Sequence, residues 1–279
     1  MDFKQIESFE NKKIKLVKSL HLKKFREKEG SFLAEGVRLA ESVIEAKWQV
    51  DFGIVTESAK KKPRIRRLIK NATDSICFYE VSDALFKAIG TTDAPQGILI
   101  VVKKRNQSLL EPMRKKEEAK PLYVVLDALQ EPGNIGAIFR TADAAGADAV
   151  FLTKGCADPF SEKAVRSAMG SLFHLPIYTG IDEDELLSFF GEQRIHLFGA
   201  ALDKEAQALY TADLTMPSAV IFGNEGNGIR PSLLSVTDHL YIPMERRKGI
   251  GAESLNVAAS AAVILFEARR QRFYSSIQT

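Results

Sequence analysis

The spacing of apolar residues predicts that helices and strands alternate along the chain. In the first half, short apolar runs typical of strands are separated by stretches in which apolar residues recur at helical spacing. The expected strands are 32–35, 50–55, 76–81 and 97–102, and the expected helices lie near 14–25, 37–46, 65–70 and 82–89. Together these elements predict a small α/β domain over residues 1–105.

The second half continues the alternation after a change in composition. Residues 106–120 are charged and poor in apolar side chains, so we interpret them as a linker before a domain at 121–279. The run 121–127 has the composition of a buried parallel strand. Further strands are expected at 149–153, 196–200, 219–222 and 240–242, and helices at 161–171 and 182–191. This order favours a mainly parallel sheet flanked by helices.

A candidate ligand site lies near the end of the chain. The apolar run 219–222 stops at a loop, 223–228, that contains three glycines, and Ser254 and Asn256 open an alanine-rich helical stretch. Such loops form the rim of an α/β sheet, where ligands bind, and glycine lets the backbone approach closely. The order Gly-x-x-Gly-x-Gly is not that of a dinucleotide fold, so a phosphate cradle is not favoured. The alternative is that Ser254 and Asn256 only cap the helix.

Composition excludes several classes of protein. With 279 residues, 45% apolar and 27% charged, the chain can bury a sizeable core. Two distant cysteines and four scattered histidines have neither disulfide-framework nor metal-ligand spacing, so we expect no metal. We see no apolar run long enough to span a bilayer and no signal-peptide core at the start. We therefore expect a soluble, cytoplasmic protein without a membrane partner.

The net charge of +3 is small, but the basic residues are clustered. Lysines and arginines gather in 12–28, opposed there only by Glu27, and again in 60–70. Such clusters are typical of contacts to a phosphate backbone, although a solvated helix face has the same composition. Charge alone does not distinguish RNA from DNA, and the candidate nucleic-acid contacts, taken as RNA contacts in the interpretation below, are Lys12, Lys13, Lys23, Lys24, Arg38, Lys61, Arg64, Arg66 and Arg67.

Three segments of the second half resemble, in order, the three motifs of the SpoU (TrmH-type) branch of the SPOUT RNA methyltransferases. They are 134–142 (NIGAIFRTA), 222–228 (FGNEGNG), and 242–244 (IPM) with 253–258 (ESLNVA). The first half is similar to the RNA-binding domain of this family, which resembles certain ribosomal proteins, at 32–36 and 91–97. The resemblance thus covers nearly the whole chain. One departure is the loop 245–252, which is longer and more basic than is usual in the family.

The resemblance implies an enzyme that methylates the 2′-hydroxyl of RNA ribose with S-adenosylmethionine. It also implies a deep trefoil knot in the C-terminal domain and a homodimer formed through that domain. The implied catalytic residues are Asn134, Arg140, Glu225, Ser254 and Asn256. The implied cofactor contacts are Ala200, Gly223, Glu225, Gly228, Ile242, Met244, Ser254 and Leu255. The ribosomal-protein-like domain favours 23S ribosomal RNA as the substrate over tRNA.

Two other classes of function compete with this interpretation. A non-catalytic RNA-binding module would explain the basic clusters, but it would not need Asn134, Arg140 and Glu225 together. A dinucleotide-dependent enzyme would explain a parallel sheet with glycines, but the glycine order is wrong.

For the methyltransferase, a guanidinium is a poor base because it stays protonated. We therefore expect Arg140 to hold the RNA phosphate and hydroxyl, and whether it ever takes the proton stays open. The resemblance further implies that Arg140 enters the site of the partner subunit.

Overall fold

The computed structural model describes residues 3–72, 75–105, 120–245 and 254–275. Contacts divide the chain into two compact units. Unit 1 comprises Met1–Asn106 and Asp158–His174, and unit 2 comprises Gln107–Ala157 and Leu175–Thr279. Most of the predicted linker and most of the basic loop after Glu245 lie outside the described residues.

Unit 1 is built on a mixed five-stranded sheet in the order β1-β4-β3-β5-β2. Strand β5 runs antiparallel to β2 and β3, and the other pairs are parallel. The strands are β1 (Lys4–Ile6), β2 (Ser31–Glu35), β3 (Val50–Thr56), β4 (Phe78–Val81) and β5 (Ile98–Lys103). The helices are α1 (Lys12–Leu20), α2 (Lys23–Glu29), α3 (Val37–Glu45), α4 (Glu57–Lys60), α5 (Pro63–Ala72) and α6 (Asp83–Ile89). The short edge strand β1 was not predicted.

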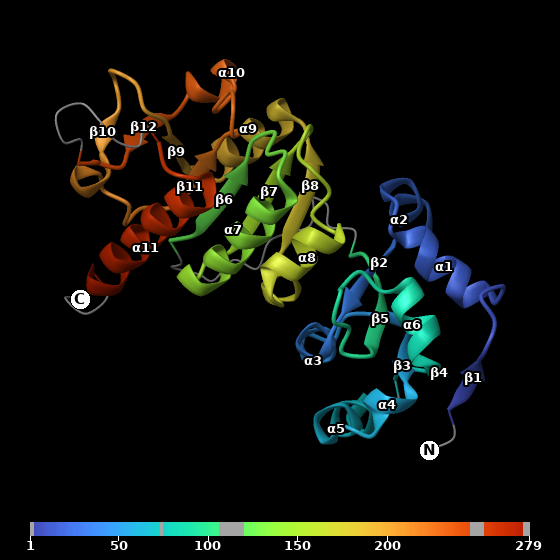
Figure 1. Cartoon of the computed structure of the whole chain (residues 1–279). Helices are drawn as coiled ribbons and strands as arrows, with labels where there is room; N and C mark the ends of the chain where they lie inside the picture. The colour runs from blue at the N-terminus through green and yellow to red at the C-terminus, as the bar shows by residue number, and fades with distance from the viewer. Residues whose placement is uncertain (1–2, 73–74, 106–119, 246–253, 276–279) are drawn as a thin grey trace. The chain divides into compact units, whose positions relative to one another are not determined.

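Helices cover both faces of this sheet. Ile14, Val17 and Leu20 recur on one side of α1 and are fully buried against the sheet, together with apolar residues of α6. Figure 1 shows α3 and α5 on the opposite face from α1 and α6. The helical spacing read from the sequence is therefore confirmed. The apolar side of each helix packs against the face of the sheet that the helix covers.

The segment 158–174 belongs to unit 1, although it lies between two strands of unit 2 in the chain. It contains α8 (Glu162–Ala168) and η1 (Ser171–Phe173). Arg26 Nε donates to Asp158 Oδ2 at 2.7 Å, and both side chains are buried. Trp48 Nε1 donates to the carbonyl of Phe173 at 3.0 Å. The hydrophobic pattern did not indicate this grouping, because it depends on contacts between segments far apart in the sequence.

Unit 2 is built on a seven-stranded, all-parallel sheet in the order β10-β12-β9-β11-β6-β7-β8. The predicted mainly parallel sheet is confirmed. The strands are β6 (Leu122–Leu126), β7 (Ala149–Thr153), β8 (Ile177–Ile181), β9 (His196–Ala200), β10 (Gln207–Ala208), β11 (Ser218–Phe222) and β12 (Asp238–Tyr241). Strands β8 and β10 were not predicted. Strand β10 has two residues, and the apolar run of β8 is interrupted at Gly180, where its register against β7 shifts.

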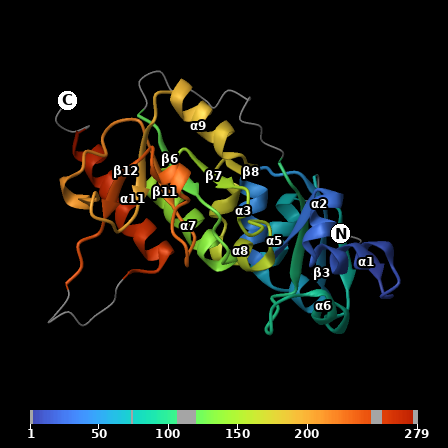
Figure 2. The same ribbon diagram turned by 90° about the horizontal axis from the view of Figure 1, so that it is seen from above.

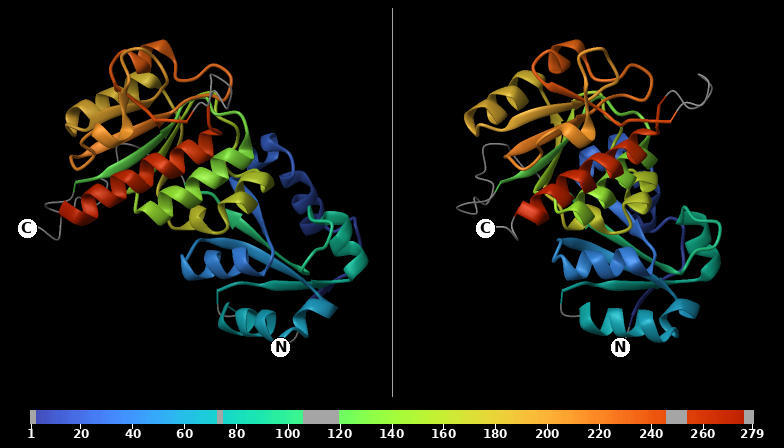
Figure 3. Two further views of the ribbon diagram at one scale, coloured as in Figure 1. Left: turned by 60° about the vertical axis from the view of Figure 1, so that its left-hand side comes forward. Right: turned by 90° about the vertical axis from the view of Figure 1, so that its left-hand side faces the viewer.

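The helices of unit 2 form a layer on each side of its sheet. They are α7 (Pro132–Ala145), α9 (Glu183–Glu192), α10 (Pro231–Leu234) and α11 (Val257–Ser275), with the short η2 (Leu209–Thr211). Figure 3 shows α7 and α11 side by side, and Figure 2 shows α9 across the sheet from them. None of the described helices is both long and apolar enough to cross a membrane. The strand order and register do not test whether the chain forms a trefoil knot, so the knot stays a prediction.

The start of α11 corrects one detail of the sequence analysis. Ser254 was expected at the N-cap position, but the helix begins at Val257. Asn256 Oδ1 accepts a hydrogen bond from the N–H of Ala258 at 2.9 Å, which is the contact of an N-cap side chain. Asn256 therefore caps α11, and Ser254 lies in the loop before it.

Candidate active site

The glycine loop 223–228 closes directly after β11. Asn224 and Gly228 exchange two backbone hydrogen bonds of 2.9 Å each, so the loop folds back on itself. A Cβ on Gly223 would lie 2.2 Å from the backbone of Gly228 and Ile229, and Gly228 has a φ of +71°. Glycine is thus required at position 223 because the backbone of residues 228–229 passes close to it, and not because a ligand approaches there.

A pocket of about 390 Å³ lies between this loop, the end of β12 and the start of α11. All eight residues that the sequence indicated as cofactor contacts line it: Ala200, Gly223, Glu225, Gly228, Ile242, Met244, Ser254 and Leu255. Leu202, Leu240, Val257 and Ile264 add apolar side chains to the wall. The pocket therefore combines exposed backbone groups of two loops with an apolar surface, within the size range of small-molecule sites.

Glu225 is the centre of a hydrogen-bond network at this pocket. Its carboxylate accepts from Asn134 Nδ2 at 3.0 Å and from the backbone N–H groups of Gln130 and Glu131 at 3.2 Å each. Asn256 Nδ2 donates to Asn134 Oδ1 at 3.2 Å. The network thus joins one residue from each of the three motif segments.

The environment of Glu225 keeps its carboxyl group ionised. Burial raises the pKa of Glu225, but hydrogen bonds from Asn134 and from backbone N–H groups, including those of Gln130 and Glu131, outweigh this effect and lower the pKa overall. Glu225 is consequently suited to accept hydrogen bonds and to fix the loops around it. A carboxylate with a lowered pKa is a weak base, so it is poorly suited to remove a proton from a ribose hydroxyl.

The structure does not bring Arg140 to this pocket. Asn134 stands near the start of α7 and Arg140 lies six residues further along, which is about 9 Å along the axis and about 240° around it. Arg140 is exposed and is not among the described residues that line the pocket. Of the five predicted catalytic residues, Asn134, Glu225 and Asn256 are hydrogen-bonded together, Ser254 lines the pocket, and Arg140 lies apart on α7.

An ion pair between buried Asp127 and partly exposed Arg230, which the sequence did not reveal, lies next to this network. Asp127, at the end of β6, is fully buried, and it accepts from Arg230 Nε at 2.8 Å and from the backbone N–H of Arg230 at 2.8 Å. Thr153 Oγ1 donates to the same carboxylate at 2.9 Å. This pair ties the segment after the glycine loop to the end of β6, directly before the backbone groups that bind Glu225.

Ala128, next to Asp127, has a φ of +51°, a conformation that costs a non-glycine residue about 1–3 kcal/mol. Thr153 Oγ1 is hydrogen-bonded to its N–H at 3.1 Å, and Asn224 Nδ2 donates to its carbonyl at 2.9 Å. These two contacts hold the turn that presents Gln130 and Glu131 to Glu225. A polar residue directly after a buried strand was the one sequence signal that could have indicated Asp127.

The nine candidate RNA contacts lie in unit 1, but on two faces of its sheet. Lys12 and Lys13 are on α1, which covers one face, and Lys23 and Lys24 are on α2 directly after it. The others lie with α3, α4 and α5 across the sheet (Figure 1): Arg38, Lys61, Arg64, Arg66 and Arg67.

Part of the positive charge on the α3–α5 side is neutralised by carboxylates. Arg64 donates to both oxygens of Glu41, at 2.7 and 2.5 Å, and Lys61 Nζ lies 2.8 Å from Glu57 Oε1. These pairs are exposed, so each contributes little to stability. They nevertheless reduce the field that this side presents to a phosphate backbone.

Comparison with known proteins identifies the family. The family model described as SpoU rRNA Methylase matches residues 121–266, and the model described as MRM3-like substrate binding domain matches residues 11–100. The chain belongs to the SpoU rRNA methylase family. The resemblance stated from the three motifs is thus confirmed, and the similarity extends through the N-terminal half.

Relatives of this SpoU family protein match over nearly their whole length. The 23S rRNA (guanosine(2553)-2′-O)-methyltransferase RlmP of Bacillus subtilis is 38% identical, over 95% of this chain and 99% of its own. The AdoMet-bound rRNA methyltransferase from Sinorhizobium meliloti has a TM-score of 0.83 at 29% identity, covering 96% of this chain and 98% of its own. AviRb from Streptomyces viridochromogenes, in complex with AdoMet, has a TM-score of 0.82 at 29% identity, covering 95% and 100%.

Proposed function

We propose that this protein transfers a methyl group from S-adenosylmethionine to the 2′-hydroxyl of a ribose in 23S ribosomal RNA. The observation that carries the proposal is the pocket at the glycine loop, where the three motif segments meet around the Glu225–Asn134–Asn256 network. Family membership and the likeness to RlmP over 95% of the chain support the reaction and the class of RNA. A cytoplasmic location belongs to the same proposal.

The residues of the pocket fit this cofactor. Gly223 and Gly228 expose backbone groups that can bind the polar part of an adenosine, while Leu240, Leu255 and Ile264 provide an apolar surface for its base. S-adenosylmethionine supplies an electrophilic methyl group on a sulfonium. Ser254 and Glu225 line the same pocket and position the acceptor relative to it. Holding the two reactants in line accounts for much of the acceleration, since a ribose hydroxyl is a weak nucleophile.

Arg140 acts, in this proposal, on the pocket of a partner subunit. It lies on the exposed side of α7, and α7 packs beside α11, where Phe266 and Phe273 are each about half exposed. These two residues are seven apart and therefore lie on one side of α11. Exposed aromatic residues in a row are typical of a protein interface. A homodimer through α7 and α11 would cover them and would bring Arg140 close to a second copy of the pocket.

The reaction is tested with labelled cofactor and RNA that lacks its own modifications. We expect label in 23S ribosomal RNA at one nucleotide. Label found only in tRNA would favour the alternative of a tRNA 2′-O-methyltransferase. Calorimetry should show binding of S-adenosylhomocysteine and none of NAD. If the protein binds neither ligand and transfers no methyl group, the alternative of a non-catalytic RNA-binding module is favoured.

The role of the dimer is tested with two inactive variants. Arg140→Ala should abolish methyl transfer while leaving the affinity for S-adenosylhomocysteine unchanged, because Arg140 does not line its own pocket. Asn256→Ala should damage the pocket of its own chain, since it removes the contact to Asn134. Mixing the two under subunit exchange should restore part of the activity, because one site per heterodimer has both residues. Mixtures that stay inactive despite proven exchange would show that each chain works alone.

RNA binding by unit 1 completes the proposal. The lysines and arginines of α1, α2, α3, α4 and α5 would hold phosphates of the ribosomal RNA while unit 2 carries out the transfer. This assigns substrate binding to residues 1–105 and methyl transfer to residues 121–279. Support comes from the match of residues 11–100 to a substrate-binding domain and of residues 121–266 to the methylase.

A further inference from the structure

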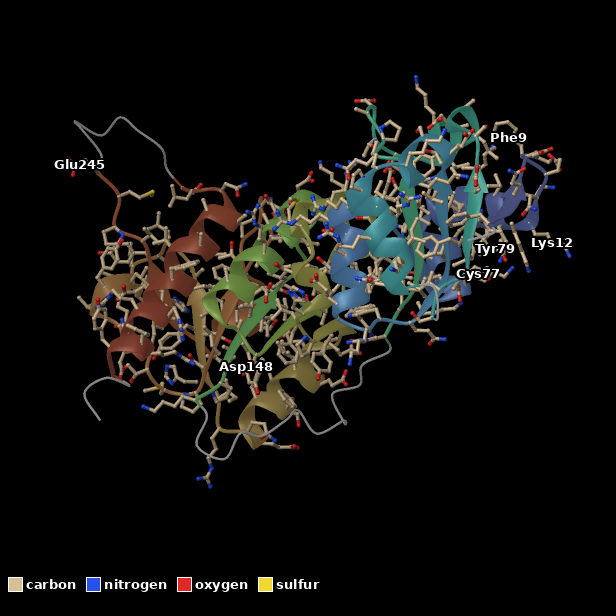
Figure 4. All side chains as sticks on the ribbon, turned by 90° about the horizontal axis from the view of Figure 1, so that it is seen from below. Phe9, Lys12, Cys77, Tyr79, Asp148 and Glu245 are labelled. Carbon is tan, nitrogen blue, oxygen red and sulfur yellow. The ribbon has the colours of Figure 1, made fainter. Side chains whose placement is uncertain are left out.

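An exposed aromatic ring stands among the lysines of α1. Phe9 lies in the turn between β1 and α1, and its side chain is 46% exposed. Lys18 Nζ lies 4.6 Å from the centroid of its ring. Figure 4 shows Phe9, Lys12 and Tyr79 at the same end of unit 1. An accessible ring with a cation beside it is the arrangement found where proteins stack on nucleic-acid bases.

A second ring lies close by because of the sheet register. Strand β1 pairs with β4 so that Lys4 is opposite Tyr79. Lys13 Nζ lies 4.6 Å from the centroid of the Tyr79 ring and 4.3 Å from that of Phe52. Phe52 is buried, whereas Tyr79 is partly exposed. The edge strand, the turn and α1 therefore present two rings and several ammonium groups on one surface.

The geometry of α1 leaves its lysines available for phosphates. Ile14, Val17 and Leu20 are buried, which turns Lys12, Lys15 and Lys18 outward, and these three are exposed. Lys15 pairs with Glu10, and that pair is itself exposed. Lys12 and Lys18 thus flank the turn that carries Phe9.

We propose that this surface, the Phe9 face (Phe9, Lys12, Lys13, Lys18 and Tyr79), binds an unpaired stretch of RNA, with a base stacked on Phe9 and the lysines on the adjoining phosphates. The inference rests on the proposed function, since it specifies which part of the RNA unit 1 contacts. Bases within an RNA duplex are stacked on one another and not open to an aromatic side chain, whereas those of loops, bulges and ends are. An exposed phenylalanine therefore selects single-stranded RNA over a duplex.

The other basic surface of unit 1 lacks these features. In the described parts of α3, α4 and α5, no large hydrophobic side chain is exposed. Arg64 and Lys61 are there engaged by Glu41 and Glu57. Lys60 Nζ lies 5.6 Å from the centroid of the Phe3 ring, but that ring is only partly exposed. A surface of partly neutralised cations without a largely exposed ring attracts phosphates, but it offers a base little to stack on. The two basic surfaces should thus differ in the form of RNA they prefer.

The test measures binding of the full-length protein to a 12-nucleotide single-stranded RNA of mixed sequence and to the blunt duplex it forms with its complement. Phe9→Ala should weaken single-strand binding about tenfold and leave duplex binding unchanged, because one base–aromatic contact is lost. Phe9→Leu should weaken it similarly, since leucine keeps apolar volume but has no π face. Phe9→Trp should retain the affinity. Tyr210→Ala, which removes a 60% exposed ring from unit 2, is the matched control.

The dependence on salt separates stacking from charge. In Phe9→Ala the slope of log affinity against log salt should stay at the wild-type value, whereas Lys12→Glu should reduce it by about 0.7. Equal losses for single strand and duplex, full affinity in Phe9→Leu, or no single-strand binding by the wild type would each overturn the proposal. Failure of the proposed function would appear elsewhere, as absence of methyl transfer to ribosomal RNA by the wild-type protein.

Discussion

The pocket of unit 2 and the basic surfaces of unit 1 place their polar residues in different ways. At the pocket, a network of hydrogen bonds of 3.0–3.2 Å centres on the carboxylate of Glu225. The Asn134 side chain and two backbone N–H groups donate to this carboxylate, and Asn256 donates to Asn134. On unit 1, the lysines and arginines are spread along exposed helices on two faces of a sheet. Convergence makes each residue necessary for the arrangement of the others, whereas dispersed charges act nearly independently.

This difference predicts how each region responds to substitution. Loss of one member of a hydrogen-bonded network leaves its partners without their contacts, so effects are large and not additive. Loss of one exposed cation removes about one phosphate contact, so effects are small and sum over positions. In the part of unit 1 that the structure describes, the buried Arg26–Asp158 pair is an exception, and it joins the segment 158–174 to the rest of the unit.

The largest effect is expected at that exception. Asp158→Ala should lower the free energy of unfolding by about 3–5 kcal/mol, because Arg26 would remain buried without its carboxylate. Urea unfolding followed by the fluorescence of Trp48, in the same unit, measures the change. Glu57→Ala removes the exposed partner of Lys61 and serves as the control, with an expected loss of under about 1 kcal/mol. Equal losses in both variants would mean that the buried pair does not hold the segment.

The next effect should appear in the reaction. Glu225→Gln should reduce the rate of methyl transfer about 10²–10³-fold, since an amide has one acceptor oxygen in place of the two that bind Gln130, Glu131 and Asn134. Single-turnover transfer to ribosomal RNA measures it. Glu192→Gln, which changes an exposed side chain at the end of α9, should transfer at the wild-type rate. A rate near that of the wild type in Glu225→Gln would remove Glu225 from the centre of the site.

A smaller, graded effect is expected on the basic surfaces. The double reversal Lys12→Glu with Lys18→Glu should lower the salt slope of single-strand binding by about 1.4, the sum of two phosphate contacts. Arg66→Glu with Arg67→Glu on α5 changes the same number of charges and should lower that slope by less. Equal reductions would mean that the two surfaces do not differ in the RNA they contact. In both variants the affinity for S-adenosylhomocysteine should stay that of the wild type.

The smallest effect concerns pH and the contact of α1 with α8. A hydrogen bond with Glu162 raises the pKa of His21 above 6.5 despite partial burial, with further support from the Ile89 carbonyl and the charge of Glu35. The stabilisation by protonated His21 is therefore complete below pH 6.5 and is lost as the pH rises through the raised pKa. His21→Gln should remove a stabilisation of about 1 kcal/mol at low pH and little at high pH. Thermal unfolding across this range checks it, and an identical pH profile in the variant would contradict it.

Much of the fold follows from periodicity, which is a local property. Ile14, Val17 and Leu20 predicted a buried helix stripe, and the run 121–127 predicted a buried parallel strand; both are confirmed. The residues expected at the pocket could be named because the motifs around Gly223, Met244 and Ser254 are short contiguous segments. Strands β1 and β10 were missed because they have only three and two residues. Strand β8 is as long as β6, but Thr179 and Gly180 interrupt its apolar run.

The sequence by itself determined most of the helices and strands, where the glycine loop lies and which family the chain belongs to. Only the tertiary structure decided that Asp127 pairs with Arg230, 103 residues away, and that Glu225 binds Asn134, 91 residues away. It also decided that the two basic clusters lie across a sheet from one another and that 158–174 packs in unit 1. The physical reason is that hydrophobic spacing specifies which face of an element is buried, while the partner of that face is chosen by packing among all elements at once.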